Sequence, residues 1–211
     1  MMRDFWFIPM GNIWLVAGNA ENNTAQERLL RFCYSYVKMK GHSMNNITLI
    51  GMPGAGKSSI GVVLAKVLGY QFIDSDLLIQ KEEKRTLSEI IEQDGIDGFK
   101  AVENRVNASI QVENTVIATG GSVVYCDEAM QHLKSEGVVV YLKISLKLLS
   151  KRLGNLKDRG VVLKEGQTLE SLYEERTVLY EKYADIIVDE EDKDLEGSLQ
   201  IVLDALKRGE K

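Results

Sequence analysis

The stretch Asn46-Ile47-Thr48-Leu49-Ile50-Gly51-Met52-Pro53-Gly54-Ala55-Gly56-Lys57-Ser58-Ser59 decides the fold of this chain. It contains Gly51-x-x-x-x-Gly56-Lys57-Ser58, the phosphate-binding P-loop pattern. The pattern alone also occurs by chance, so its surroundings decide its meaning. The apolar run 47–50 before it predicts a buried strand, and the apolar residues after it recur at helical spacing up to Gly69. Strand, glycine loop and helix therefore follow one another in the order that phosphate binding requires.

The residue types in this loop suit a nucleoside triphosphate. Glycines let the backbone bring its N–H groups against phosphate oxygens, and the N-terminus of the following helix adds unpaired donors and a positive dipole end. Lys57 can reach the β- and γ-phosphates as a mobile cation, and the Ser58 hydroxyl can take a place on Mg²⁺. The residues expected to bind the nucleotide in this loop are Gly51, Gly54, Ala55, Gly56, Lys57, Ser58 and Ser59.

Composition points to an ordinary globular protein. The 211 residues can bury a substantial core in one domain, and they are 45% hydrophobic and 27% charged with a net charge of −5. Without a basic stripe a nucleic-acid partner is not expected, and no apolar run approaches membrane-spanning length. The two cysteines have no metal-ligand spacing, which fits a reducing, cytoplasmic compartment.

Residues 1–43 differ in character from the rest of the chain. Apolar, aromatic runs at 5–8 and 13–17 are interrupted by Pro9, Gly11 and Asn12, and 26–39 has the periodicity of a helix. A secretory leader would need a more basic start and a longer apolar core. We interpret this segment as an N-terminal extension that is dispensable for chemistry, or as a leader from an over-called start codon before Met44.

Beyond the P-loop, short apolar runs alternate with stretches of helical periodicity. The expected strands are 71–73, 115–119, 138–142 and 184–188, and the expected helices are roughly 77–93, 98–111, 127–135, 145–153 and 168–182. Strands separated by helices predict parallel pairing through right-handed crossovers, with helices on both faces of the sheet. Residues 44–211 are therefore expected to form one three-layer α/β/α domain around a five-stranded parallel sheet.

An acidic pair, Asp74-Ser75-Asp76, follows the second strand. Ligands of open α/β sheets bind beyond the carboxyl ends of the strands, where this pair would lie. One carboxylate could help to hold Mg²⁺ and the other could accept a proton from a substrate hydroxyl. The alternative is that Asp76 only caps a helix beginning at Leu77.

Three further features are candidates for substrate contact. Thr119-Gly120-Gly121-Ser122 follows the third strand, where paired glycines suggest close approach to a ligand or a tight turn. Arg176 falls within the apolar stripe of the late helix, so it needs either a structural carboxylate or an anionic ligand. The glycine-bounded, basic segment 154–166 has the composition of a loop that closes over phosphates, or of an exposed connection.

Lys100 and Glu103, one turn apart, are by themselves typical of a solvated salt bridge.

Over residues 44–206 these motifs resemble the shikimate kinase family of P-loop kinases. The resemblance is carried by the P-loop, Asp74-Ser75-Asp76, Gly95 with Phe99-x-x-x-Glu103, Gly120-Gly121, Arg152, Asp158-Arg159, and Glu175-Arg176 followed by Tyr180 and Ala184. It implies ATP as the phosphoryl donor, with Asp74 organising Mg²⁺ and Arg152 stacking on adenine. It further implies Asp76 as the base on the ring hydroxyls, Arg176 on the acceptor carboxylate, and Arg159 of the lid (about 154–166) on the phosphates.

The sequence departs from the family pattern at three positions. Lys100 stands where the family has a carboxylate-binding arginine, Ser122 replaces a third glycine, and Gly160 replaces the proline after the lid arginine. Lysine keeps the charge but loses the bidentate fork. The first two positions belong to the acceptor end of the site, so the reaction type is better indicated than the acceptor.

The sequence therefore predicts a monomeric, ATP- and Mg²⁺-dependent kinase of a small hydroxylated carboxylate. Shikimate is the expected acceptor, and other small hydroxy acids or amino-alcohols such as gluconate or homoserine are the alternatives. Lys57, Asp76 and Arg159 are the expected catalytic residues, Ser58 and Asp74 the metal ligands, and Asp76, Lys100, Gly120, Gly121 and Arg176 the acceptor-binding residues. A nucleotide-binding regulatory protein without turnover is disfavoured because Lys57, Asp76 and Arg159 are all present.

Overall fold

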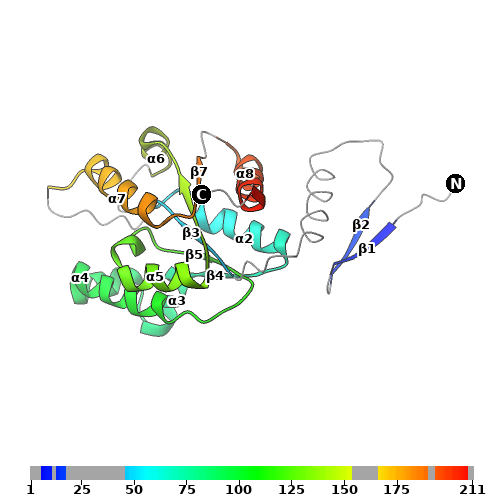
Figure 1. The fold of residues 1–211 in the computed structure, drawn as a ribbon. Helices are drawn as coiled ribbons and strands as arrows, with labels where there is room; N and C mark the ends of the chain where they lie inside the picture. Colours follow the sequence, from blue (N-terminus) through cyan, green and yellow to red (C-terminus); the bar gives the residue numbers. More distant parts are fainter. Residues whose placement is uncertain (1–5, 11–12, 18–45, 154–165, 190–192, 209–211) are drawn as a thin grey trace. The chain divides into compact units, whose positions relative to one another are not determined.

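The computed structural model describes residues 6–10, 13–17, 46–153, 166–189 and 193–208 (Figure 1). Its contacts divide the chain into two units, residues 1–43 with 67–69, and residues 44–66 with 70–211. In the first unit, strands β1 (Trp6–Met10) and β2 (Ile13–Ala17) pair antiparallel. The helix expected over 26–39 lies outside the described residues.

The second unit contains a sheet of five parallel strands with the P-loop strand at its centre. The order across the sheet is β4-β5-β3-β6-β7, and every neighbouring pair is parallel. The strands are β3 (Asn46–Ile50), β4 (Gln71–Asp74), β5 (Thr115–Ala118), β6 (Gly137–Lys143) and β7 (Ile186–Asp189). The expected five-stranded parallel sheet is confirmed.

Helices cover both faces of this sheet. In the view of Figure 1, α3, α4 and α5 gather below the strands, and α6, α7 and α8 lie above them. The helices of this unit are α2 (Lys57–Leu68), α3 (Ser75–Glu83), α4 (Leu87–Ala108), α5 (Asp127–Glu136), α6 (Leu146–Leu153), α7 (Leu169–Tyr183) and α8 (Leu195–Arg208), with a 3₁₀ turn, η1 (Val123–Tyr125). The three-layer α/β/α architecture follows, and α8 adds a helix that the sequence did not predict.

The helix expected over 77–93 is in fact two helices. Lys84 ends α3 in the left-handed region, with φ 54°, and Thr86 caps α4 in a reciprocal capping box with Glu89. The α4 helix then continues through the separately expected stretch 98–111 as far as Ala108, with one break at Gly95, where φ is 74° and ψ is 179°. The prediction missed the boundary at 84–86 because hydrophobic periodicity continues across it, and the gap that it left at 94–97 contains the break at Gly95.

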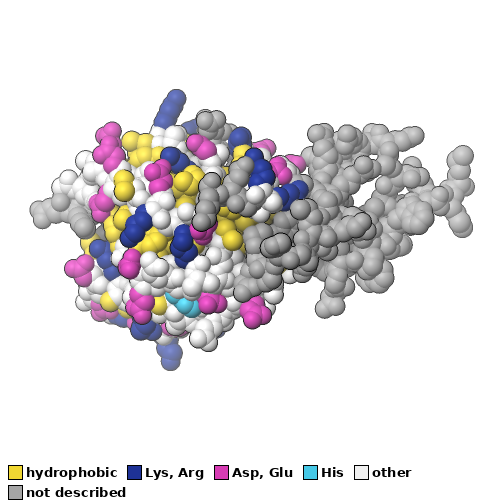
Figure 2. Space-filling view, in the orientation of Figure 1, with side chains coloured by type: hydrophobic (Ala, Val, Ile, Leu, Met, Phe, Trp, Pro, Cys, Tyr) yellow, Lys and Arg dark blue, Asp and Glu magenta, His cyan; other side chains and the backbone are white. Residues whose placement is uncertain are grey.

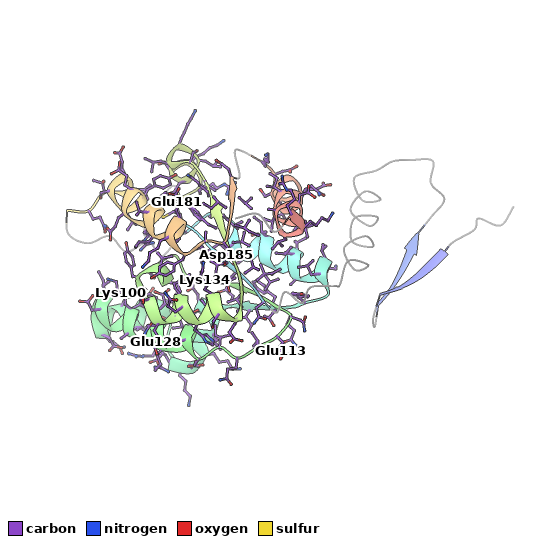
Figure 3. All side chains as sticks on the ribbon, viewed as in Figure 1. Lys100, Glu113, Glu128, Lys134, Glu181 and Asp185 are labelled. Atoms are coloured by element: carbon purple, nitrogen blue, oxygen red, sulfur yellow. The ribbon has the colours of Figure 1, made fainter. Side chains whose placement is uncertain are left out.

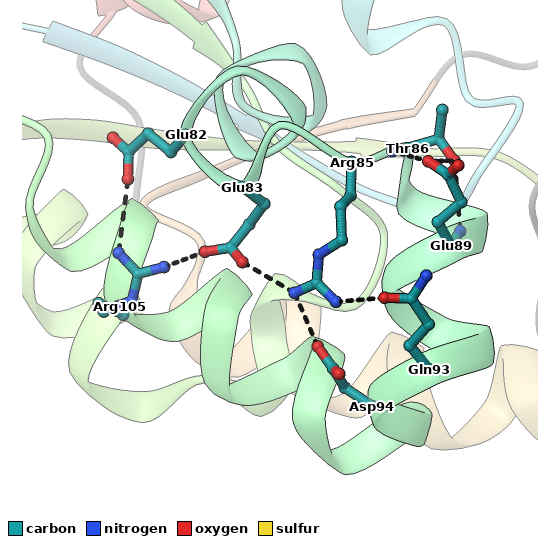
Figure 4. A network of polar contacts seen from close by, with 8 residues as sticks. All are labelled: Glu82, Glu83, Arg85, Thr86, Glu89, Gln93, Asp94 and Arg105. Carbon is teal, nitrogen blue, oxygen red and sulfur yellow. Dashed lines mark hydrogen bonds and ion pairs between the residues drawn. The ribbon is translucent and has the colours of Figure 1, made fainter.

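A polar network joins the two helices at this turn (Figure 4). The Arg85 guanidinium bonds Glu83 at 2.9 Å, Asp94 at 2.8 Å and the Gln93 side-chain oxygen at 3.0 Å. Arg105, further along α4, also contacts Glu83. Because Glu83 ends α3 and the other partners lie on both sides of Gly95, the network ties α3 to both segments of α4.

Side chains at the start of the strands hold the sheet in register. The Asn46 amide donates to the Val112 carbonyl at 2.7 Å and its oxygen accepts from the Thr115 N–H at 3.1 Å, which aligns β3 with β5. On the other side of the sheet, Lys134 and Asp185 point toward one another (Figure 3), with 2.7 Å between the ammonium and the carboxylate. That ion pair anchors α5 to the turn before β7.

On the face shown in Figure 2, basic and acidic side chains of the described residues are interspersed. Among the described residues, every helix is too short or too polar to cross a bilayer.

We predict that a chain beginning at Met44 folds and keeps its activity. All the strands of the sheet, and every site residue discussed below that the structure describes, lie between 46 and 208. Circular dichroism, thermal unfolding and kcat of the truncated chain should match those of the full chain. Insolubility or inactivity of the truncated chain alone would mean that residues 1–43 belong to the fold or to the site.

Candidate functional site

The candidate site lies where three neighbouring strands end. Leu49 of β3 and Asp74 of β4 both pair with Ala118 of β5, so the segments that follow these strands emerge side by side. Thr119 reinforces the junction, because its N–H and its hydroxyl both donate to the Leu49 carbonyl, at 3.2 and 3.0 Å. The P-loop, the acidic pair and the paired glycines are thereby brought together, as the sequence predicted.

The P-loop has the backbone of an anion cradle. Gly51, Gly54 and Gly56 have φ values of 146°, 80° and 93°, which disfavour residues with a side chain. A Cβ on Gly51 would lie 2.7 Å from the carbonyl oxygen of Leu142 on β6. The loop can therefore take its course only with glycine at this position, and α2 begins directly after it at Lys57.

Lys57 is held inside its own loop. Its ammonium donates to the carbonyl oxygens of Gly51 at 2.8 Å and Met52 at 3.0 Å, and its side chain is 7% exposed. Burial lowers the pKa of Lys57 to about 8, and Arg176 contributes in the same direction, whereas Asp76 opposes the change. A phosphate group in the cradle would supply the counter-charge that the buried ammonium lacks.

Ser58 and Asp74 meet at the mouth of the cradle. The Ser58 hydroxyl donates to Asp74 Oδ2 at 2.8 Å, while Asp74 Oδ1 accepts from the backbone N–H groups of Asp76 and Leu77 at 3.0 and 3.4 Å. Asp74 is therefore the N-cap of α3, and the alternative that Asp76 caps a helix beginning at Leu77 is wrong. A hydroxyl and a carboxylate this close beside a phosphate cradle are oxygen donors that fit Mg²⁺.

Asp76 does not cap α3, and its carboxylate lies against the first of the paired glycines. A Cβ on Gly120 would lie 2.8 Å from Asp76 Oδ1 and 2.6 Å from Glu103 Oε1, so two carboxylates face the same glycine. Burial, together with the neighbouring Asp74, raises the pKa of Asp76, and Lys57 opposes the increase. A carboxylate with a raised pKa is a stronger base than an ordinary aspartate, which suits proton abstraction from a hydroxyl.

Glu103 is buried instead of forming a solvated pair with Lys100. It is fully buried, and its Oε1 atom has no hydrogen-bond partner among the described residues. Burial raises the pKa of Glu103 to about 7, against the effect of the nearby Ser122 hydroxyl. Lys100 instead lies 3.7 Å from the exposed Asp97. The salt bridge expected from spacing alone is wrong.

Arg176 is buried in the late helix without a carboxylate partner. It is 8% exposed, and within the described residues no carboxylate comes within ion-pair distance of it. A Cβ on Gly121 would lie 3.2 Å from its Nη1 atom, and its Nε–H donates to the Tyr125 hydroxyl at 3.4 Å. Of the two partners that the sequence left open, an anionic ligand is the one that this geometry favours.

One predicted nucleotide contact, Arg152, lies beside the P-loop. Arg152 of α6 donates to the carbonyl oxygens of Gly54 and Ala55 at 3.4 and 3.5 Å, which puts it beside the cradle. Arg159, and nearly all of the predicted lid at 154–166, lie outside the described residues.

Sequence reasoning missed Tyr125. It follows two valines, so it was indistinguishable from a core residue, yet its ring lies 5.0 Å from the Lys100 ammonium and 5.4 Å from the Arg176 guanidinium. Its position three residues after Ser122, beside the glycines, was the signal that could have identified it.

Comparisons with known proteins agree with this geometry. The family model described as shikimate kinase matches residues 53–207. A shikimate kinase of Clostridium botulinum is 38% identical over 169 residues, which cover 78% of this chain and 98% of that protein. Shikimate kinase 2 of Yersinia pseudotuberculosis is 41% identical over 107 residues, and there the match spans 51% of this chain and only 62% of the relative's length.

Solved structures give the same result. A shikimate kinase from Acinetobacter baumannii in complex with shikimate has a TM-score of 0.71 and 31% identity, covering 78% of this chain and 94% of that one. The enzyme from Aquifex aeolicus has a TM-score of 0.64 and 31% identity, covering 77% and 96%. With the P-loop, the acidic pair and the buried arginine in place, this chain belongs to the shikimate kinase family.

Proposed function

We propose that the chain transfers the γ-phosphoryl group of ATP to a hydroxyl group of shikimate. The observation that carries this proposal is the arrangement of charge around the paired glycines. Asp76 lies against Gly120 as a base, and the buried Arg176 lies against Gly121 with no carboxylate partner in the described part of the chain. An acceptor with a carboxylate at one end and a hydroxyl at the other satisfies both.

In this proposal the nucleotide end of the site stabilises charge. The P-loop amides and the N-terminus of α2 bind the phosphates, and Lys57 exchanges its two carbonyl contacts for phosphate oxygens. Ser58 and Asp74 would hold Mg²⁺, which would neutralise charge on the phosphates when bound. Arg152 would contact the nucleoside, and Arg159 of the lid the transferred group.

At the acceptor end, Asp76 positions the hydroxyl and removes its proton as the phosphoryl group is transferred. Gly120 has no side chain, which lets Asp76 and Glu103 both lie against it, and Arg176 beside Gly121 would bind the acceptor carboxylate together with Lys100. Measuring kcat/KM for a panel of hydroxy acids tests this proposal. Faster transfer to another hydroxy acid than to shikimate would contradict it. A monomeric state and a cytoplasmic location stay predictions.

The first prediction concerns the cradle lysine. Lys57→Ala should lower kcat by about 10³-fold or more and weaken ATP binding, because a charge aimed at the transferred group is removed. The domain should still fold, as shown by thermal unfolding. Lys66→Ala, which changes an exposed lysine of the same helix, is the matched control. Normal turnover of Lys57→Ala would contradict the P-loop assignment.

The second prediction concerns the acceptor cations. Arg176→Ala should lower kcat/KM for the acceptor by roughly a hundredfold, because a bound carboxylate left unpaired costs about 2–5 kcal/mol. The KM for ATP should change much less. Arg105→Ala removes an exposed arginine of α4 and should leave the acceptor KM unchanged.

The Lys100→Arg variant tests whether shikimate or another hydroxy acid is the acceptor. If shikimate is the acceptor, restoring the bidentate fork should preserve or improve its use. Impaired use, together with parent activity on shikimate no better than on unrelated hydroxy acids, would rule out shikimate while leaving the kinase assignment standing.

The third prediction concerns Glu103 and pH. The folded protein holds the Glu103 proton up to about pH 7, whereas the unfolded chain releases it near 4.5, so the folded state binds more protons between these values. The free energy of unfolding should therefore lose a component on the order of 3 kcal/mol as pH rises through this window. Denaturant unfolding at several pH values should show that Glu103→Gln lacks this component.

Glu113→Gln, which removes an exposed glutamate, is the control for the loss of a charge. A constant difference in stability between the parent and Glu103→Gln at all pH values would show that Glu103 ionises like an exposed glutamate.

A further inference from the structure

Tyr125 stands at the acceptor end of the site in a tightly bonded turn. It ends η1, directly after the paired glycines, and its N–H donates to the Ser122 carbonyl at 2.9 Å. The next residue, Cys126, donates to the Val123 carbonyl at 2.8 Å. Two consecutive backbone hydrogen bonds fix the Cα–Cβ direction of Tyr125, so only its side-chain torsions remain to place the ring.

Two cations from different helices converge on this ring. The Lys100 ammonium of α4 lies 5.0 Å from the ring centroid, and the Arg176 guanidinium carbon of α7 lies 5.4 Å from it. Both distances are within the range in which a ring quadrupole attracts a cation. The Arg176 Nε–H also donates to the phenol oxygen at 3.4 Å. Tyr125 is therefore the residue that both cations share.

Neither cation has a buried carboxylate partner in the described residues, although Arg176 also bonds the buried Tyr180. The ion pair of Lys100 is with Asp97, at 3.7 Å, and the Asp97 side chain is fully exposed, so solvent screens the pair. Arg176 is buried and has no ion pair there. Contact with Tyr125 is thus a restraint that both head groups share before a ligand arrives.

A lysine needs an external contact to fix its head group more than an arginine does. An ammonium is a point charge on a flexible four-carbon stem, without the planar fork that orients an arginine on a carboxylate. Two like charges also repel one another, so a group that holds both beside the paired glycines prepares a site for one anion. Burial raises the pKa of the Tyr125 phenol, so it stays neutral and accepts the Arg176 hydrogen bond at neutral pH.

We infer that Tyr125 is a positioning residue of the acceptor site, which holds Lys100 and Arg176 in place for the carboxylate of the acceptor. This inference rests on the proposed function, because it takes a carboxylate as the ligand of both cations. Tyr125 acts through these two side chains and takes no part in phosphoryl transfer.

Two variants separate the ring from its hydroxyl. Tyr125→Leu removes both and should raise the shikimate KM by about five- to thirtyfold, the size of one or two partly buried cation–ring contacts. Tyr125→Phe keeps the ring and loses only the hydroxyl's bonds with Arg176 and Glu175, so its KM should rise by about threefold or less. In both variants kcat and the KM for ATP should stay close to the parent values.

Tyr183→Phe is the matched control, because Tyr183 also carries a lysine over its ring, Lys182 at 4.5 Å, and also bonds through its hydroxyl, to Asp127. It should leave the shikimate KM unchanged. An increase as large as that expected for Tyr125→Leu would mean that a disturbance of α7 alone weakens acceptor binding, which would overturn the inference.

A second substrate tests whether Tyr125 acts through the carboxylate. The analogue of shikimate with a hydroxymethyl group in place of the carboxylate offers nothing to the two cations. The parent and Tyr125→Leu should use this analogue equally poorly, whereas they should differ on shikimate. An equal loss on both substrates would show a general structural defect and would overturn the positioning role.

Calorimetric titration of shikimate into the parent and Tyr125→Leu provides a readout that needs no turnover. Equal affinities with an active parent would overturn the inference alone. A parent that neither binds nor phosphorylates shikimate would overturn the proposed function, so the two failures are distinguishable.

Discussion

The structure depends on the closing of the P-loop over the end of the central strand. Lys57 lies at the start of α2 and donates back to the carbonyls of Gly51 and Met52, so strand, loop and helix are bonded into one rigid unit. Gly51 approaches the Leu142 carbonyl too closely for any side chain, which locks this unit against β6. The Lys57 ammonium is buried, and no carboxylate of the described residues lies within ion-pair distance of it. The loop is therefore stable enough to be preformed, yet its charge is completed only by an anion.

The burial of charged groups continues from the P-loop across the strand ends to the acceptor end of the site. Parallel pairing places the ends of β3, β4 and β5 side by side, which concentrates Lys57, Asp76, Glu103 and Arg176 in a small volume. Burial disfavours the charged forms of the acids and of the lysine, and the altered pKa values of Lys57, Asp76 and Glu103 are the consequence. A hydroxylated carboxylate with a nucleoside triphosphate would supply counter-charges to both cations and a proton to the base. The burial of these charged groups would therefore account both for the binding of anionic substrates and for the raised pKa of the base.

Sequence predicted the features that depend on local pattern. The P-loop, the alternation of strands and helices, and the place of the acidic pair were all correct, because they follow from glycine, periodicity and strand ends. The boundary between α3 and α4 was missed, although the capping box of Thr86 and Glu89 marks it, because the apolar periodicity runs through it. The partner of Lys100 and the role of Tyr125 could not be predicted, since they depend on contacts between α4, η1 and α7.

Two of the three departures from the family pattern lie at the acceptor end of the site, and the third, Gly160, lies outside the described residues. Lys100 lies over Tyr125, and Ser122 follows the paired glycines beside the buried Glu103, which lacks a partner on one oxygen. The nucleotide end keeps every residue of the loop pattern. Lys100 turns to Tyr125 and Asp97 and not to Glu103, so burial raises the pKa of Glu103 against the opposing effects of Ser122, Arg176 and Lys57. The ionisation of Glu103 is therefore set by the buried surroundings of the acceptor end and not by its neighbour one turn away on α4.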